Sequence, residues 1–206
     1  MIVAKDCDKC HNKRHIFKEG VGWVRCECID ELRADKLMSK SGLPEPLWSI
    51  DSRSFKPGDD SDRKVLANAI KKITDAYDKK PVFIYSTQPD KDRAAAIIAR
   101  YTAILHPSVE TISYIKLDKL VQRQFKKDVM ETDFIDPVTA DITILGIGDE
   151  ITNKAHQNAI YTLLYDRILG ERFTIVTSFV PKNRIVQIYH KAVDDLMKNN
   201  FSFYSC

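Results

Sequence analysis

Four cysteines near the start of the chain offer its clearest chemistry. They form a C-x-x-C pair and, after 15 intervening residues, a C-x-C pair: Cys7, Cys10, Cys26 and Cys28. Two close pairs across a short hairpin can present four thiolates tetrahedrally, which suits Zn²⁺. We therefore predict a structural zinc site, because four protein ligands leave no coordination position open for a substrate.

The segment around these cysteines is poor in core residues. A segment this small folds only if a cross-link or a bound metal ion holds it together, and zinc binding would itself supply the folding free energy. The sequence GVGW, residues 20–23, provides a turn that leads into the second pair. Two alternatives remain open: four free thiols, or a ligand set in which His11 or His15 replaces Cys28, if Cys28 faces away.

The second chemical feature is the segment 86–93, STQPDKDR, between a strand-like run and a helical stretch. This order of elements is the layout of a nucleotide-binding P-loop. A P-loop needs glycines, so that backbone N–H groups curl around the phosphates, followed by Lys and Ser/Thr. Residues 86–93 contain no glycine, and G-x-x-x-x-G-K-[ST] occurs nowhere in the chain. The sequence therefore predicts no ordinary P-loop ATP hydrolysis.

Charged residues in this loop allow a weaker alternative. Lys91 and Arg93 could bind an anion at the start of the helix, where the helix dipole helps. Asp90 and Asp92 lie beside them and oppose an anion. We interpret the two aspartates as helix-capping residues.

Composition limits the class of protein. A chain of 206 residues with 44% hydrophobic residues can bury one good core and a small accessory module. The net charge of +3 permits contact with nucleic acid but does not require it. The N-terminus lacks an apolar signal region, and no run approaches the roughly 18 apolar residues of a membrane span. We expect a cytoplasmic protein, whose cysteines are thiols or metal ligands rather than disulfides.

Strand-like and helical patterns alternate in the rest of the chain. A short helix is expected over 30–40 and another over 63–78. Four strand-like runs follow, at 82–86, 111–115, 141–145 and 173–179, with a possible edge strand at 201–204. Helical stretches lie at about 91–104, 116–129, 154–169 and 183–198. This alternation predicts an α/β fold with a parallel sheet and helices on both faces. We divide the chain into a zinc-binding module (1–30), a linker helix and junction (31–58), and an α/β domain (59–206).

In this order, the features resemble the DnaC/DnaI-type replicative helicase loaders and the related IstB-like ATPases of the AAA+ superfamily. The resemblance rests on the cysteine module and on three stretches: SGLPEPLWSIDSRSF (41–55), DITILGIGDE (141–150) and YTLLYDRILGERFTIVTSF (161–179). These look like the family's junction, its Walker B strand, and the stretch that ends in sensor 1. The resemblance implies an AAA+-like fold and a DnaB-type helicase as partner, met through the N-terminal region.

The departures from the family pattern concern its ATPase elements. In an ungapped alignment the two Walker B acids fall on Gly146 and Ile147, while Asp149 and Glu150 lie three residues further on. Phe179 stands where sensor 1 has a polar Asn, and it cannot orient water. With the loop at 86–93, three ATPase elements are altered together. We therefore predict a degenerate ATPase fold and no enzyme activity.

Three arginines could be proposed as arginine fingers or phosphate ligands. We interpret them instead as surface or loop residues: Arg93, Arg172 and Arg184.

The clearest basic face lies in residues 115–128. Its basic residues share one side at helical spacing: Lys116, Lys119, Arg123, Lys126 and Lys127. An apolar side carries Leu117, Leu120, Val121 and Phe125. In the resembling loaders, the helix after the second strand contacts single-stranded DNA, so we name the basic side as a DNA-binding candidate; a solvated helix face is the equal alternative. It carries no aromatic residue, so contact would be to phosphates.

A weaker basic cluster surrounds the cysteines, and that module could instead bind a protein. Its members are Lys13, Arg14, Lys18 and Arg25.

The leading hypothesis is a non-enzymatic DNA replication accessory protein of the primosome, which binds the replicative helicase and helps to place it on DNA. A phage or another mobile element would be a fitting source. One alternative is an inhibitor of a host helicase or helicase loader. A second is a rearranged ATP site that uses Lys91 with Asp149 and Glu150. A third is an IstB-like accessory protein of DNA transposition.

Overall fold

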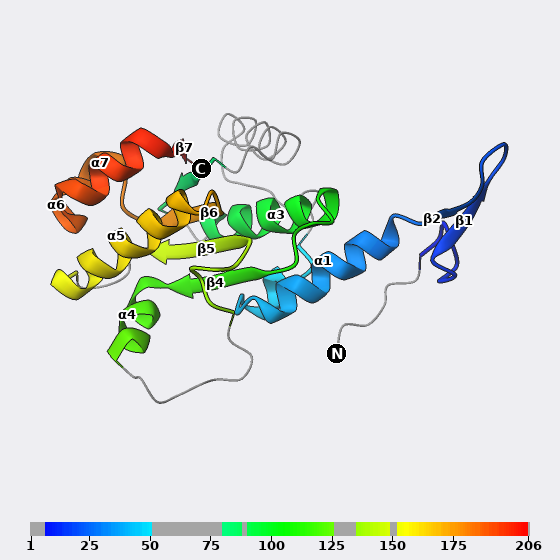
Figure 1. The fold of residues 1–206 in the computed structure, drawn as a ribbon, viewed down its shortest axis with the longest axis horizontal. Helices are drawn as coiled ribbons and strands as arrows, with labels where there is room; N and C mark the ends of the chain where they lie inside the picture. The colour runs from blue at the N-terminus through cyan, green and yellow to red at the C-terminus, as the bar shows by residue number, and fades with distance from the viewer. Residues whose placement is uncertain (1–6, 51–79, 88–89, 126–134, 149–151, 206) are drawn as a thin grey trace.

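A computed structural model of the chain describes residues 7–50, 80–87, 90–125, 135–148 and 152–205, and the structural statements below concern these residues (Figure 1). The helix predicted over 63–78 lies outside them.

The cysteine module contains a two-stranded antiparallel hairpin. Strand β1 spans His15–Lys18 and β2 spans Gly22–Arg25, with Phe17 opposite Trp23. Gly20 and Gly22, in the predicted turn, have φ of +77° and +88°. Glycine adopts such left-handed angles without steric penalty, which explains the two glycines of GVGW.

The main sheet has five strands, and each neighbouring pair is parallel. Its order is β4-β5-β6-β3-β7. The strands are β3 (Val82–Tyr85), β4 (Ile112–Lys116), β5 (Ile142–Ile147), β6 (Phe173–Ser178) and β7 (Ser202–Ser205). The predicted parallel α/β sheet is confirmed, and the predicted edge strand is present as β7.

The helices follow the predicted alternation except at the C-terminal end. The longer ones are α1 (Cys28–Lys40), α3 (Asp90–Leu105), α4 (Leu117–Phe125) and α5 (Lys154–Leu169). The single helix predicted over 183–198 is wrong. The chain there forms a 3₁₀ turn (Lys182–Arg184), α6 (Ile185–Tyr189) and α7 (Lys191–Asn200). His190, with φ of +78°, cannot continue a right-handed helix, and its ring accepts a hydrogen bond from the N–H of Ala192.

Helices cover both faces of the sheet (Figure 1). Successive strand residues point to opposite faces, so Ile84 packs with α1 and α3 while Phe83 packs with α4, α5 and α7. Two apolar cores result, one on each side of the sheet.

Helix α1 is packed onto the α/β body. Ala34 and Met38 are fully buried in the core that α3 shares, and Arg100 Nε donates to Asp35 Oδ1 over 2.7 Å. The helix also begins at Cys28, inside the cysteine module. The division into domains stays a prediction. Helix α1 runs without interruption across the predicted boundary between the zinc-binding module (1–30) and the linker (31–58).

The junction after α1 is fixed against the edge strand β4. The N–H of Tyr114 donates to the carbonyl of Ser41 over 2.7 Å. Gly42 has φ of +87°, and a Cβ there would lie 3.2 Å from the carbonyl oxygen of Tyr114. Glycine is therefore required in this S-G-L-P stretch for both its angle and its close approach.

No described helix is long and apolar enough to cross a membrane.

Candidate functional site

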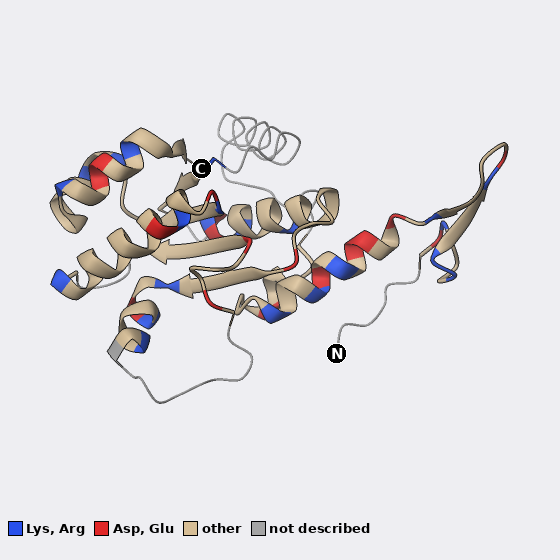
Figure 2. Cartoon of the chain, viewed as in Figure 1, with Lys and Arg blue, Asp and Glu red and all other residues tan. Residues whose placement is uncertain are grey.

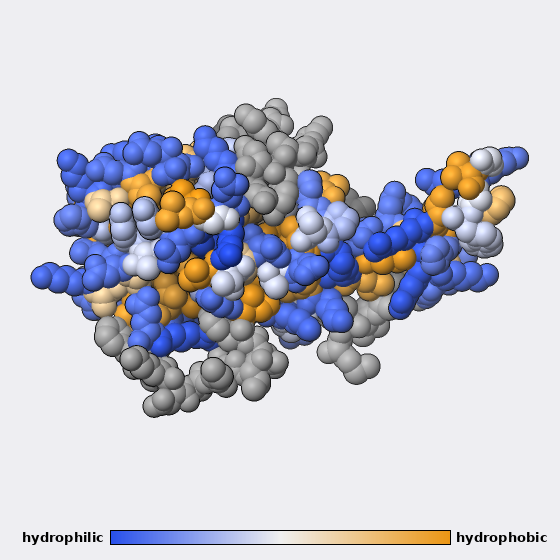
Figure 3. All heavy atoms as spheres, in the orientation of Figure 1, coloured by the Kyte–Doolittle hydropathy of each residue, from blue (hydrophilic) through white to orange (hydrophobic). Residues whose placement is uncertain are grey.

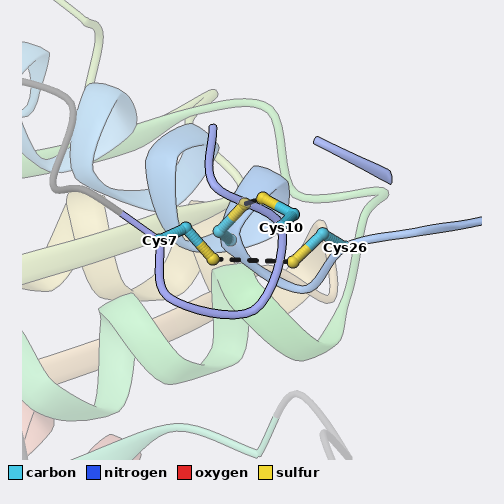
Figure 4. Close-up of side chains that lie close together, drawn as sticks. Cys7, Cys10 and Cys26 are labelled. Atoms are coloured by element: carbon cyan, nitrogen blue, oxygen red, sulfur yellow. Dashed lines mark hydrogen bonds between the residues drawn. The ribbon is translucent and has the colours of Figure 1, made fainter. Parts of the chain in front are cut away.

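The four cysteines converge as the sequence predicted. Cys7 and Cys10 lie in the turn before the hairpin, Cys26 follows β2, and Cys28 starts α1. The four Sγ atoms all lie within 4.8 Å of one another. Figure 4 shows the thiols of Cys7, Cys10 and Cys26 turned toward a common centre. Neither His11 nor His15 belongs to this group, so among the described residues the ligand set contains cysteines alone.

The sulfur spacing fits a tetrahedral metal ion. Cys7 Sγ lies 3.7 Å from Cys26 Sγ, and Cys10 Sγ lies 3.6 Å from Cys28 Sγ. A tetrahedron of sulfurs at about 2.3 Å from zinc has edges of about 3.8 Å. The cluster could therefore hold a metal ion such as zinc.

The electrostatics of the cluster also favour a cation. Burial raises the pKa of the Cys28 thiol, and the neighbouring Cys26 and Cys10 raise it further. Burial acts in the same direction on Cys10. The backbone N–H of Arg14 and the other thiols outweigh burial there and lower the pKa of Cys10 to about 7. Four thiolates this close repel one another, so all four can be ionised together only around a cation.

The second candidate site lies at the carboxyl edge of the sheet, where β3 and β6 are neighbours. Ligands of open parallel sheets bind at this edge, where the chain crosses from one side of the sheet order to the other. Here the N–H of Ser86 donates to the carbonyl of Ser178 over 3.1 Å. Helix α3 then starts at Asp90, beside the ends of both strands.

Side chains of the chain itself occupy the space next to the first turn of α3. Thr177 Oγ1 donates to Asp92 Oδ1 over 2.8 Å, and Lys91 Nζ lies 3.3 Å from Asp92 Oδ2. Lys91 Nζ also lies 3.3 Å from the centre of the Phe179 ring, and its side chain is only 3% exposed. The lysine that could have met an anion is thus covered by an aromatic ring and neutralised by a carboxylate of the same chain.

This network changes two interpretations made from the sequence. Asp92 lies in the first turn of α3, as a capping residue would, but its carboxylate reaches Thr177 on β6 and Lys91. Lys91, considered from the sequence as an anion ligand, instead lies against Asp92 and the Phe179 ring. We call Lys91, Asp92, Thr177 and Phe179 the edge cluster.

The Walker B position is close to the edge cluster. Gly146 lies in β5, and a Cβ there would be 3.7 Å from both Lys116 Cγ and Thr177 Oγ1, which is ordinary contact. Its neighbour Ile147 is buried in the core. Asp149 and Glu150 lie outside the described residues, so their proposed use in a rearranged site stays a prediction.

The three arginines considered as fingers occupy different places. Arg93 Nη1 lies 3.8 Å from Asp90 Oδ1, and half of its side chain is exposed. Arg172 precedes β6, at the amino edge of the sheet, and donates to the carbonyl of Val138. Arg184 is exposed in the 3₁₀ turn.

The predicted basic face lies partly on α4 (Figure 2). Lys116 is the last residue of β4 rather than a helical residue, while Lys119 and Arg123 lie on α4. Leu117, Leu120 and Val121 are buried on the opposite side, as predicted. Lys126 and Lys127 lie outside the described residues.

Asp118 is the acid that interrupts this face. Its carboxylate lies 2.8 Å from His156 Nε2 on α5, so it joins the two helices.

Comparison with solved structures identifies the fold. A crystal structure of DnaI superposes with a TM-score of 0.65 at 13% identity, over 80% of this chain and 94% of that one. A putative primosome component from Streptococcus pyogenes serotype M3 gives 0.63 at 16% identity, over 82% and 94%. The DnaC helicase loader gives 0.62 at 13% identity, over 79% and 99%. No family model matches the chain, and no curated protein matches its sequence.

The α/β domain is therefore AAA+-like, as the sequence resemblance implied, and a four-cysteine cluster precedes it.

Proposed function

We propose that this protein is a DNA replication accessory protein, which binds a DnaB-type replicative helicase and assists its placement on DNA without hydrolysing ATP. The observation that carries the proposal is a fold similar to helicase loaders over about four fifths of the chain. A loader can act stoichiometrically, because binding energy at a partner interface can favour an open helicase ring without hydrolysis.

The edge cluster supports the absence of hydrolysis. Phosphoryl transfer needs a cation and a Mg²⁺-holding carboxylate directed at the phosphates. In this chain Lys91 faces Asp92 and the Phe179 ring, and Gly146 stands at the Walker B position. The Asp92 carboxylate therefore pairs with the Lys91 ammonium group, which would otherwise be available to a phosphate.

Two surfaces are assigned to partners under this proposal. The cysteine module, held by zinc, would meet the helicase. The basic residues at the end of β4 and on α4 would contact the phosphates of single-stranded DNA, and they are Lys116, Lys119, Arg123, Lys126 and Lys127. A source in a phage or another mobile element stays a prediction.

Gel filtration of the purified zinc-containing protein with the helicase of its host tests the central claim. We expect co-elution, and a failure to co-elute would contradict the proposal. A strand-displacement assay on protein-coated single strands then gives the direction of the effect. A loader raises helicase activity, whereas reduced activity would favour the inhibitor hypothesis instead.

Calorimetric titration with Mg²⁺-ATP tests the second claim separately. We expect no heat of binding at micromolar nucleotide. Measurable binding heat would overturn the proposed loss of nucleotide chemistry, whatever the helicase result.

A further inference from the structure

The cysteine hairpin exposes an apolar face, to which the proposed function assigns no contact of its own beyond the general role of the cysteine module. Phe17, Val21 and Trp23 are 64%, 72% and 69% exposed. The rings of Phe17 and Trp23 are cross-strand neighbours, with centroids 5.8 Å apart and planes at 71°. Exposed apolar residues that gather in one place commonly mark a binding surface. We call these three residues the hairpin face.

The pleat of the two strands places the rings of the hairpin face on one side of the ribbon. Ile16 pairs with Val24, and both are partly buried, whereas Phe17 and Trp23 point to the other side of the ribbon. The hairpin lies at one end of the molecule, away from the main sheet (Figure 1). Figure 3 shows apolar surface on this projecting hairpin beside hydrophilic residues. No described part of the chain covers the two rings.

The surroundings of the hairpin face are basic. Exposed cations lie on and next to the strands: Lys13, Arg14, Lys18 and Arg25. Glu19 is the single carboxylate between His11 and Arg25. Arg25 also pairs with Asp30 over 2.9 Å, which leaves the other three cations to set the local potential. The face therefore combines flat aromatic rings with an excess of positive charge.

We propose that the hairpin face binds single-stranded DNA, with bases stacked on Phe17 and Trp23 and phosphates held by Lys13, Arg14 and Lys18. Stacking platforms beside cations are the usual chemistry for binding unpaired strands, and each stacked base can contribute on its own. A stable protein interface needs roughly 20–30 residues a side. This hairpin has four residues in each strand, so by itself it fits a nucleotide chain better than a folded partner, and the helicase would have to contact the rest of the cysteine module as well.

The choice of DNA over RNA rests on the proposed function, because stacking alone does not distinguish the two. The helicase claim is tested on different components, so either proposal can fail without the other.

The test compares two fluorescent strands of equal length and charge on the full-length, zinc-containing protein: an oligo(dT) of about 20 nucleotides, and the same backbone without bases. We expect tighter binding of oligo(dT). Trp23→Ala should weaken oligo(dT) binding about tenfold and leave the abasic strand unchanged, because only the base contact is lost. Lys18→Ala should weaken both strands equally, because only a phosphate contact is lost.

Tyr165→Ala is the matched control. Tyr165 is 43% exposed and stacks on Tyr161 of α5, so the variant removes an exposed stacked ring away from the hairpin and should change neither affinity. Trp23→Tyr should keep most of the affinity, because it keeps a ring. Zinc content measured for each variant shows that the hairpin is intact.

Three results would overturn the inference. The first is equal affinity for oligo(dT) and the abasic strand. The second is an oligo(dT) affinity that Trp23→Ala leaves unchanged while zinc is retained. The third is loss of helicase co-elution in Trp23→Ala with DNA binding intact, which would make the face a protein-docking surface. Tighter binding of oligo(rU) than of oligo(dT) would overturn the choice of DNA.

Discussion

At the scale of single residues, Lys91 makes the most unusual contacts in the described chain. Its side chain is 3% exposed, yet it carries an ammonium group next to one carboxylate and one aromatic ring. Burying a charge is unfavourable unless it is paired, so Asp92 must supply much of the compensation. Asp92 is in turn held by Thr177, and the edge cluster therefore depends on the carboxylate at its centre.

Asp92→Ala should destabilise the protein by about 2–4 kcal/mol, because it leaves a buried ammonium unpaired and removes the hydrogen bond from Thr177. Urea unfolding followed by circular dichroism measures the change. Arg93→Ala is the control, since the Arg93 side chain is half exposed and its ion pair with Asp90 is 3.8 Å long, and it should change stability by less than about 1 kcal/mol. Equal losses in both variants would show that Asp92 does not compensate Lys91.

Cys10→Ser should remove bound zinc, since serine supplies no thiolate and three sulfurs hold the ion more weakly. Metal analysis of the purified protein should give one zinc per chain before the change and much less than one after it. Lys9→Ala is a suitable control, because the pair of Lys9 with Glu27 is exposed on both sides and close to the cluster. Full zinc content in Cys10→Ser would rule out the four-cysteine ligand set.

At the scale of elements, local pattern accounts for much of what the sequence could predict. The helix predicted at about 154–169 is present as α5, and the Asn153 side chain caps it by accepting from the N–H groups of Ala155 and His156. The four-cysteine cluster could be predicted because its members are close in sequence, so spacing alone restricts their geometry.

The edge cluster could not be predicted in the same way. Thr177 and Asp92 are 85 positions apart, and their contact exists only because β6 lies next to β3 in the sheet. The break at His190 was missed for a different reason, because one residue with positive φ leaves the apolar periodicity on both sides intact.

The packing of α1 on α3 depends on a buried ion pair. Asp35→Ala leaves Arg100, which is 7% exposed, without its carboxylate and should lower stability by about 3–5 kcal/mol. The double variant Asp35→Leu with Arg100→Met should recover most of that loss, because apolar residues of similar volume replace both charges. Urea unfolding of the three proteins tests this. If the double variant is as unstable as Asp35→Ala, the pair contributes through its geometry and not through compensation of charge.

At the scale of the whole molecule, the candidate surfaces lie far apart. The hairpin stands at one end of the long axis, and α4 lies toward the other (Figure 1). Helix α1 starts at Cys28 in the cysteine module and is buried against α3 of the α/β body. Under the two proposals, a partner held at the hairpin and a strand held at α4 would therefore lie toward opposite ends of the molecule.

The same reasoning predicts how the protein assembles. Under the proposed function the chain binds no ATP that could hold subunits together in a ring or spiral, because the edge cluster occupies the start of α3. Sedimentation velocity should therefore give the same distribution with and without Mg²⁺-ATP, with a monomer as the expected species. The helicase hexamer should instead act as the template, so that larger complexes form only when it is added. An ATP-dependent shift to larger species in the absence of helicase would contradict this, and it would mean that nucleotide still binds at the carboxyl edge.

Repeating the run with Asp92→Ala separates the two explanations of a negative result. If ATP promotes assembly of Asp92→Ala, the Asp92 carboxylate is what prevents ATP binding. If ATP still has no effect, the cause is the missing glycines of the loop and the missing acid at Gly146.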